Sequence, residues 1–155
     1  MADNAGLDEF KQGVELLRKN QPAKAAEFFR HAAGLKRQNP YYLSFLGVSM
    51  VRSQGHWGAA VELCKTAVNL KRDDAQLYLN LAEAYVSAGR RDIAIETLDT
   101  ASRFCKTDRR IARMRGRLGK RRSPVLPFLD RGNFLNRGLG KLRHRVLVSA
   151  GMSVN

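Results

Sequence analysis

The residue types that most often perform catalysis are few in this sequence of 155 residues, and they are widely separated. The three histidines, His31, His56 and His144, lie in different segments, and none has a cysteine, histidine or carboxylate at metal-site spacing. No Gly-x-Ser-x-Gly elbow occurs, and no phosphate-binding glycine loop follows a strand-like segment. We therefore expect no metal, cofactor or small-molecule substrate, and predict that the protein is not an enzyme.

Positive charge is the other chemical feature, and it is concentrated at one end. The formal net charge is +14; residues 1–105 contribute +2 and residues 106–155 contribute +12. Such a segment attracts phosphates or other anions. The candidate contacts are Arg109, Arg113, Arg117, Arg121, Arg122, Arg137, Lys141, Arg143 and Arg145.

Small residues recur every 34 or 35 positions through the first two-thirds of the chain. Four columns show this spacing: Gly13, Gly47 and Ala82; Ala25, Ala60 and Ala94; Ala32, Ala67 and Ala101; and the turn residues Asn20, Gly55 and Gly89. A small residue within a helix lets the next helix approach closely, and Gly or Asn between helices supplies a left-handed turn. The columns therefore indicate repeated helical hairpins.

Large apolar residues fill the positions between these columns. They include Leu16, Phe28, Phe29, Leu46, Met50, Trp57, Leu63, Tyr78, Leu81, Tyr85, Ile93, Ile95 and Leu98. The pattern predicts helices over 7–19, 22–36, 41–54, 57–70, 75–88 and 91–105, with N-caps at Asp73-Asp74 and Thr107-Asp108. Pro22 fits the first turn of its helix, where proline is tolerated.

The order of small and bulky positions resembles the tetratricopeptide repeat, a helix–turn–helix unit of about 34 residues. The segments that carry the resemblance are FKQGVELL with NQPAKAAEFFRHAAGL, LGVSM with GHWGAAVELCKTAVNL, and LYLNLAEAY with GRRDIAIETLDTA. It implies an all-α, right-handed solenoid of three repeats, at 7–39, 40–73 and 74–107, after an N-terminal tail at 1–6. Residues 108–120, with Ile111, Met114 and Leu118 on one helical face, predict a capping helix.

In that family the first helices of the repeats line a concave surface. The resemblance therefore implies a peptide-binding groove formed by Leu7, Phe10, Val14, Leu17, Arg18, Tyr41, Ser44, Val48, Val51, Arg52, Gln76, Leu79, Glu83, Val86 and Ser87. Most of these residues are apolar, so we expect an apolar extended or helical peptide as the ligand. The partner would be a segment of another protein.

One subclass of the family grips the acidic tails of heat-shock chaperones with Lys and Asn in the first repeat and Lys and Arg in the third. The matching positions here are Phe10, Val14, Gln76 and Asn80, so this ligand is disfavoured. Another subclass, the chaperones of secreted translocators, binds apolar segments but usually has an acidic balance and an N-terminal extension. We expect neither feature in this chain, so this subclass stays open only as an alternative.

The last segment, 121–155, is a basic tail that contains prolines and glycines. Within it, residues 133–148 have the pattern of an amphipathic helix, with Leu135, Leu139, Leu142 and Val146 on one side. Three roles remain open for it: docking on the repeats, lying on an anionic membrane surface, or contacting nucleic acid. The segment 121–127 also fits a basic-flanked P-x-x-P ligand pattern, which we interpret as a linker.

The two leading hypotheses are an adaptor or chaperone-like module that binds protein in its groove, and an anion binder that acts through the basic region. No run of 18 apolar residues and no secretory signal pattern occurs, so we expect a cytoplasmic protein. Cys64 and Cys105 are too few for a disulfide scaffold, and we expect both to be reduced. Because the ends of a repeat stack are exposed, the sequence leaves open whether the chain forms a homodimer.

Overall fold

The computed structural model describes residues 6–54 and 57–119, and these residues form helices and no strand. The helices are α1 (Leu7–Arg18), α2 (Pro22–Leu35), α3 (Pro40–Gln54), α4 (Trp57–Leu70), α5 (Ala75–Ser87), α6 (Arg91–Phe104) and α7 (Arg109–Gly119). Each boundary lies within one residue of the range that the sequence predicts. The all-helical repeat fold is therefore confirmed.

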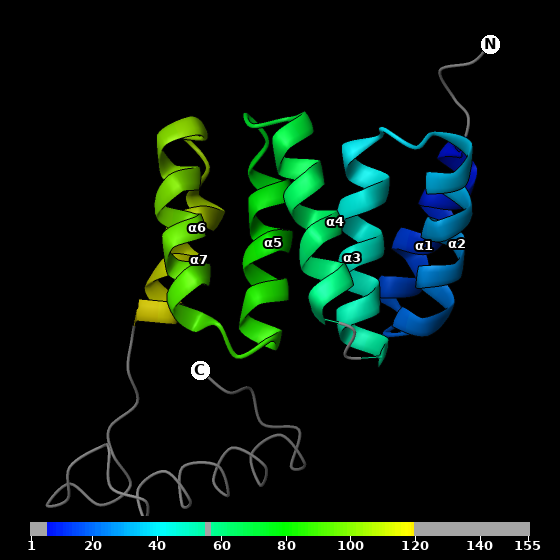
Figure 1. The fold of residues 1–155 in the computed structure, drawn as a ribbon, viewed down its shortest axis with the longest axis horizontal. Helices are drawn as coiled ribbons and strands as arrows, with labels where there is room; N and C mark the ends of the chain where they lie inside the picture. Colours follow the sequence, from blue (N-terminus) through cyan, green and yellow to red (C-terminus); the bar gives the residue numbers. More distant parts are fainter. Residues whose placement is uncertain (1–5, 55–56, 120–155) are drawn as a thin grey trace, which may run out of the picture. The chain divides into compact units, whose positions relative to one another are not determined.

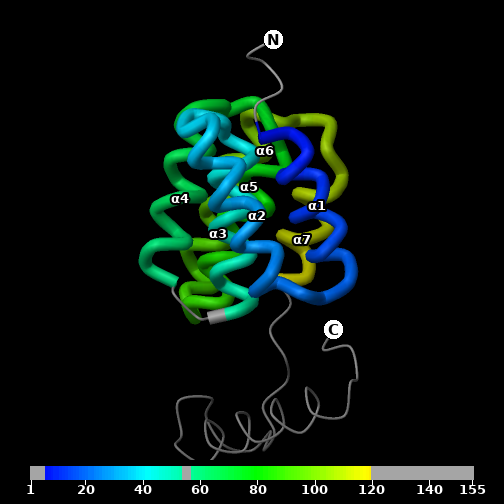
Figure 2. The backbone as a smooth tube through the Cα atoms, turned by 90° about the vertical axis from the view of Figure 1, so that its right-hand side faces the viewer, coloured from blue at the N-terminus to red at the C-terminus, as the bar shows by residue number. Residues whose placement is uncertain are grey.

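The helices of this unit lie side by side as consecutive hairpins (Figure 1). Each helix from α1 to α5 packs on the next one in the chain, and α3 also packs on both α1 and α5. Figure 2 shows the stack from the α1–α2 end, with the later pairs behind. The first helices of successive pairs are thus neighbours, as the repeat requires.

The predicted turn chemistry is present at the ends of the helices. Asn20 and Gly89 both have a positive φ, of 54° and 75°, so they provide the left-handed turns between α1 and α2 and between α5 and α6. Pro22 occupies the first turn of α2. Asp74 caps α5 by accepting a hydrogen bond from the Gln76 amide, and Asp108 accepts one from the Arg110 amide at the start of α7.

The small-residue columns form the contacts between helices. Ala25, Ala60 and Ala94 are fully buried, and so are Ala32, Ala67 and Ala101. A Cβ atom on Gly13 would lie 2.6 Å from the ring of Phe29, and one on Gly47 would lie 2.8 Å from the Ala60 carbonyl oxygen. A side chain at these positions would therefore force the paired helices apart.

Apolar side chains form two core clusters, one around Phe29 and Leu46 and a larger one from Val51 to Leu118. Cys64 lies in the larger cluster, where burial raises the pKa of its thiol to about 12, and both cysteines are free. Trp57 corrects the sequence interpretation, because it is 49% exposed at the start of α4 rather than packed between the alanine columns. Within the described residues, no helix is long and apolar enough to cross a membrane.

Candidate functional site

The candidate site is the surface that α1, α3, α5 and α7 share. Direct side-chain contacts join these helices: Phe10 of α1 meets the ring of Phe45 of α3, Asn80 of α5 donates to Ser44 of α3, and Arg110 of α7 donates to Gln76 of α5. These contacts join the three helices that carry the predicted groove positions to one another and to α7. We refer to the surface that the four helices share as the first-helix face.

The first-helix face is built of rows whose members lie one repeat apart in the sequence. The rows are Leu7, Tyr41, Gln76 and Arg110; Phe10, Ser44, Leu79 and Arg113; Val14, Val48, Glu83 and Arg117; Leu17, Val51 and Val86; and Arg18, Arg52 and Ser87. The register of α7 follows from its buried residues, because Ile111 and Leu118 lie one repeat after Leu77 and Ala84 and share one core cluster with them. The capping helix thus continues the spacing of the first helices.

Apolar side chains occupy the α1 end of this face. Leu7, Phe10, Val14 and Leu17 are all half-buried. The ring of Phe10 lies 5.5 Å from Phe29, 5.2 Å from Tyr42 and 5.3 Å from Phe45, so an aromatic cluster holds it in place. This end presents fixed apolar surface, beside the exposed Arg18.

Three of the predicted groove residues lie in the interior instead. Ser44, Val48 and Val51 are 0%, 2% and 8% exposed, because α1 and α5 both pack against α3. Ser44 accepts a hydrogen bond of 2.8 Å from Asn80 through its hydroxyl, and its carbonyl accepts one from the Cys64 thiol. In this conformation these three side chains support the face rather than provide its accessible surface.

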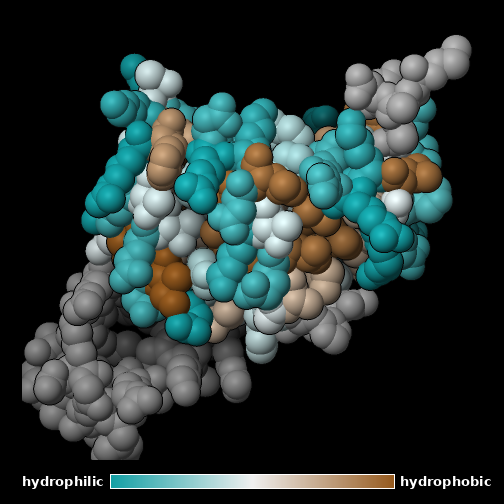
Figure 3. Space-filling model, turned by 45° about the horizontal axis from the view of Figure 1, so that its top comes forward, coloured by the Kyte–Doolittle hydropathy of each residue, from teal (hydrophilic) through white to brown (hydrophobic). Residues whose placement is uncertain are grey.

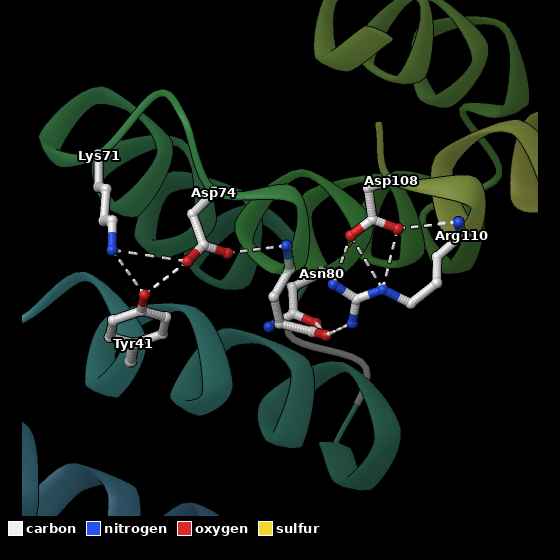
Figure 4. Close-up of polar contacts among 7 residues, drawn as sticks. Tyr41, Lys71, Asp74, Asn80, Asp108 and Arg110 are labelled. Atoms are coloured by element: carbon white, nitrogen blue, oxygen red, sulfur yellow. Dashed lines mark hydrogen bonds and ion pairs between the residues drawn. The ribbon is translucent and has the colours of Figure 1, made fainter. Parts of the chain in front are cut away.

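A polar network crosses the middle of the face (Figure 4). The Tyr41 hydroxyl donates to the Asp74 carboxylate at 2.5 Å and accepts from the Lys71 ammonium at 2.8 Å, and this bond raises the pKa of Lys71. Gln76 donates to Asn80 at 2.8 Å. The network holds the start of α3 to the start of α5.

Arg52 and Glu83 form a second bridge between α3 and α5. The Arg52 Nε and Nη2 atoms donate to the two Glu83 oxygens at 2.6 and 3.0 Å. This bidentate pair raises the pKa of Arg52, and it balances the negative charge of Glu83 within the face. Leu79 and Val86, on the same helix as Glu83, remain half-buried and exposed, respectively.

Arginines occupy the α7 end. The Arg110 guanidinium donates to Gln76 at 2.7 Å and to both oxygens of Asp108, and the bonds to Asp108 lower the pKa of its carboxyl. Arg109, Arg113 and Arg117 are exposed, and within the described part of the chain their side chains have no hydrogen-bond or ion-pair partner.

Two contacts from α6 fix the position of α7. Arg115 pairs with Asp99 at 2.8 Å, which lowers the pKa of Asp99. Arg91 donates through its guanidinium to the Leu118 and Arg117 carbonyl oxygens, so it satisfies acceptors at the end of α7 that the helix itself leaves open. These contacts orient the arginine row relative to α5.

Arg110 was not among the residues that we predicted for the groove. The signal that identifies it is its spacing of one repeat from Gln76, which places the capping helix in register with the first helices. The other predicted basic contacts, Arg121, Arg122, Arg137, Lys141, Arg143 and Arg145, lie outside the described residues, as does the proposed amphipathic helix at 133–148.

Other surfaces offer less organised chemistry. A hollow of about 450 Å³ lies between the α4–α5 and α6–α7 loops and is lined by Asp73, Asp74, Phe104, Lys106 and Arg110, among others. Among residues 6–54 and 57–119, no three histidines, cysteines or carboxylates gather as a metal site would require. Figure 3 shows apolar surface in separate patches framed by hydrophilic side chains.

Comparisons with solved structures find the same fold in several proteins. The Sgt2 TPR domain from Aspergillus fumigatus aligns with 16% identity and a TM-score of 0.66, covering 86% of this chain and 93% of that chain. TTC0263, a TPR protein of Thermus thermophilus, aligns with 24% identity and a TM-score of 0.67, covering 74% of this chain and 64% of that one.

A third structure carries a ligand. The first TPR of Spaghetti (RPAP3), bound to the HSP90 peptide SRMEEVD, aligns with 13% identity and a TM-score of 0.64, covering 74% of this chain and 93% of that chain. At these identities the likeness shows the fold alone. A comparison with curated protein sequences gave no significant match.

The family comparison agrees with the structure. Residues 51–118, from the end of α3 into α7, match the family model described as the tetratricopeptide repeat. This range includes the Ala60, Ala67, Ala94 and Ala101 positions, all of them fully buried. Residues 51–118 thus match the tetratricopeptide repeat, and the stacked hairpins of the described residues have the fold of solved TPR structures.

Proposed function

We propose that this protein is a protein-interaction module whose first-helix face binds a segment of another polypeptide. The observation that carries the proposal is the composition of that face. Half-buried apolar side chains of α1 and α5 lie on the same surface as polar and charged groups of α3, α5 and α7. Surfaces that combine apolar anchors with a polar surround are typical of protein recognition.

The solved relatives support a polypeptide ligand in general terms. One TPR domain of RPAP3 is bound to an HSP90 peptide and another is in complex with an HSP70 peptide, and both have the fold of this chain. The chemistry of this face differs from a clamp for chaperone tails, because Phe10, Val14, Gln76 and Asn80 stand at the clamp positions. An adaptor or chaperone-like role with an apolar ligand segment fits these residues better.

The alternative is an anionic partner, nucleic acid or a membrane surface, bound through residues 106–155. The exposed Arg109, Arg113 and Arg117 favour it. Salt separates the two proposals. Apolar contacts persist at half-molar salt, whereas binding through several phosphates falls steeply between about 50 and 200 mM.

The test measures how tightly the full chain binds a synthetic fluorescent peptide. This peptide has leucines and alanines in one half and glutamines in the other, and we call it the neutral peptide. Val86 is 38% exposed on the first-helix face, so we expect Val86→Glu to weaken binding at least tenfold, since a carboxylate would have to be desolvated against the apolar half. Fluorescence anisotropy at about 50 and 500 mM salt measures the affinity.

The matched control is Leu70→Glu, because Leu70 is 46% exposed at the end of α4, a second helix that is not part of the face. This variant should bind the neutral peptide as the original chain does. Unchanged binding by Val86→Glu, or equal losses in both variants, would remove the first-helix face as the binding surface.

A further inference from the structure

We propose that Arg113 and Arg117 of α7 make the first-helix face selective for a partner segment that carries carboxylates beside its apolar residues. This inference rests on the proposed function and adds the chemistry of the partner to it. It concerns residues outside the positions at which chaperone-tail clamps bind their ligands.

The arginines of α7 differ in whether another side chain of the described residues binds them. Arg110 is bound by Asp108 and Gln76, and Arg115 by Asp99. Arg113 and Arg117 have no such side-chain partner among residues 6–54 and 57–119, and both are exposed. They therefore remain available to bind an anion.

Register places these two arginines on the binding surface. Arg113 follows Leu79, and Arg117 follows Glu83, at the spacing of one repeat. The hydrogen bond of 2.7 Å between Arg110 and Gln76, which have the same separation, shows that α7 and α5 approach each other in this register. A ligand that covers Leu79 thus has Arg113 as its neighbour in the same row.

The neighbouring acid does not cancel this charge. Glu83 is the acidic residue in the row of Arg117, and its two oxygens accept hydrogen bonds from Arg52. Asp108 and Asp99 are likewise paired with Arg110 and Arg115. The α7 end of the face therefore has an unbalanced positive charge that a ligand carboxylate would meet.

Charge complementarity also indicates which kind of ligand binds at the α7 end of the first-helix face. The chain's own residues 120–155 contain eight Lys or Arg and one acid, Asp130, so this segment would be repelled by the arginine pair. Nucleic acid satisfies the charge but not the apolar residues Leu79 and Val86 on the adjoining helix. An acidic and apolar polypeptide satisfies both.

The geometry sets the spacing within such a ligand. Helices that pack directly lie about 8–10 Å apart, and an extended chain advances about 3.3 Å per residue. A carboxylate at least about three residues from the apolar side chain over α5 is therefore needed to reach α7. The partner segment should have acidic residues at that separation, on one side of its apolar residues only.

The experiment compares three peptides with the full chain: the neutral peptide, and two versions in which glutamates or lysines replace its glutamines. We expect the glutamate peptide to bind about twofold to thirtyfold more tightly than the neutral peptide at about 50 mM salt, and the lysine peptide more weakly. The preference should shrink at about 500 mM salt, where exposed charges are screened.

The variant Arg113→Gln/Arg117→Gln should bind the glutamate and neutral peptides equally and should retain the neutral peptide. Neither side chain has a described partner, so this variant should keep the thermal unfolding midpoint of the original chain. The control is Arg103→Gln, which removes an exposed arginine from α6, a second helix, and should preserve the preference.

Equal affinity of the original chain for the glutamate and neutral peptides would overturn this inference while leaving the proposed function intact. A preference that survives in the double variant would overturn it as well. Failure of all three peptides to bind would contradict the proposed function itself. Displacement of the glutamate peptide by duplex RNA, together with equal affinity for the glutamate and neutral peptides, would also overturn this inference. That result would indicate that the anionic partner is a nucleic acid.

Discussion

Ser49 lies within α3 and is fully buried, and its hydroxyl is the buried side-chain polar group for which the described residues provide no hydrogen-bond partner. The residues that correspond to it in later repeats, Ala84 and Leu118, are apolar and buried. A buried hydroxyl without a partner costs roughly 1–3 kcal/mol, and alanine is also the better helix former. This position is therefore a site of local instability in the core.

We expect Ser49→Ala to raise the free energy of unfolding by about 1 kcal/mol, as measured by urea denaturation. Ser102→Ala is the control, because it makes the same gain in helix propensity but removes a hydrogen bond of 2.9 Å to the Leu98 carbonyl at an exposed position. It should change stability by no more than about 0.5 kcal/mol. A loss of stability in Ser49→Ala would mean that the hydroxyl has a partner.

At the scale of the helices, the small-residue column continues into α7. Gly116 follows Ala82 by one repeat and so occupies the position that Gly13 and Gly47 hold in the first two repeats. A Cβ atom on Gly47 would collide with Cys64 and the Ala60 carbonyl, whereas one on Gly116 would meet open space among the described residues. In the first two repeats, a second helix packs against this column position. At α7, no described element packs against it.

This difference predicts opposite effects of the same substitution. Gly47→Ala should lower the free energy of unfolding by about 1–3 kcal/mol, because α4 would have to move. Gly116→Ala should leave it unchanged or raise it by up to about 1 kcal/mol, through helix propensity. Urea denaturation of both variants is the measurement. A clear destabilisation by Gly116→Ala would indicate that part of 120–155 packs on α7 as a second helix would.

The sequence is sufficient to predict the helices, since columns such as Ala25, Ala60 and Ala94 repeat and the capping and turn residues mark the ends. It is less informative about which first-helix residues are accessible. Val48 and Leu79 both occupy predicted groove positions, yet Val48 is buried and Leu79 half-buried, because α1 and α5 both pack on α3, whereas α7 packs less closely on α5. Burial of this kind depends on the distance between neighbouring repeats, which a spacing pattern does not contain.

Trp57 and Arg110 are two further residues whose surroundings the sequence pattern does not determine. Trp57 is a large aromatic residue at a repeat position, and sequence pattern alone favours packing, but it lies in the first turn of α4, where it is half exposed. Arg110 is one of many arginines in a basic run, and the sequence gives its spacing of one repeat from Gln76 but not the hydrogen bond between the two side chains. Individual contacts of charged side chains require coordinates.

At the scale of the molecule, the described unit combines an apolar end at α1 with a cationic end at α7, joined by the polar network of α3 and α5. This arrangement gives a bound segment a direction, since its apolar and acidic parts would contact different helices. We propose that a polypeptide occupies the first-helix face and leaves the second helices free.

The most direct test is methyl NMR of the full chain, labelled at leucine and valine, during titration with the glutamate peptide. We expect shift changes at Leu17, Leu79 and Val86, with little change at Leu35 and Leu70, which are exposed at the ends of the second helices α2 and α4. Changes confined to Leu35 and Leu70, or to residues 120–155, would contradict this proposal.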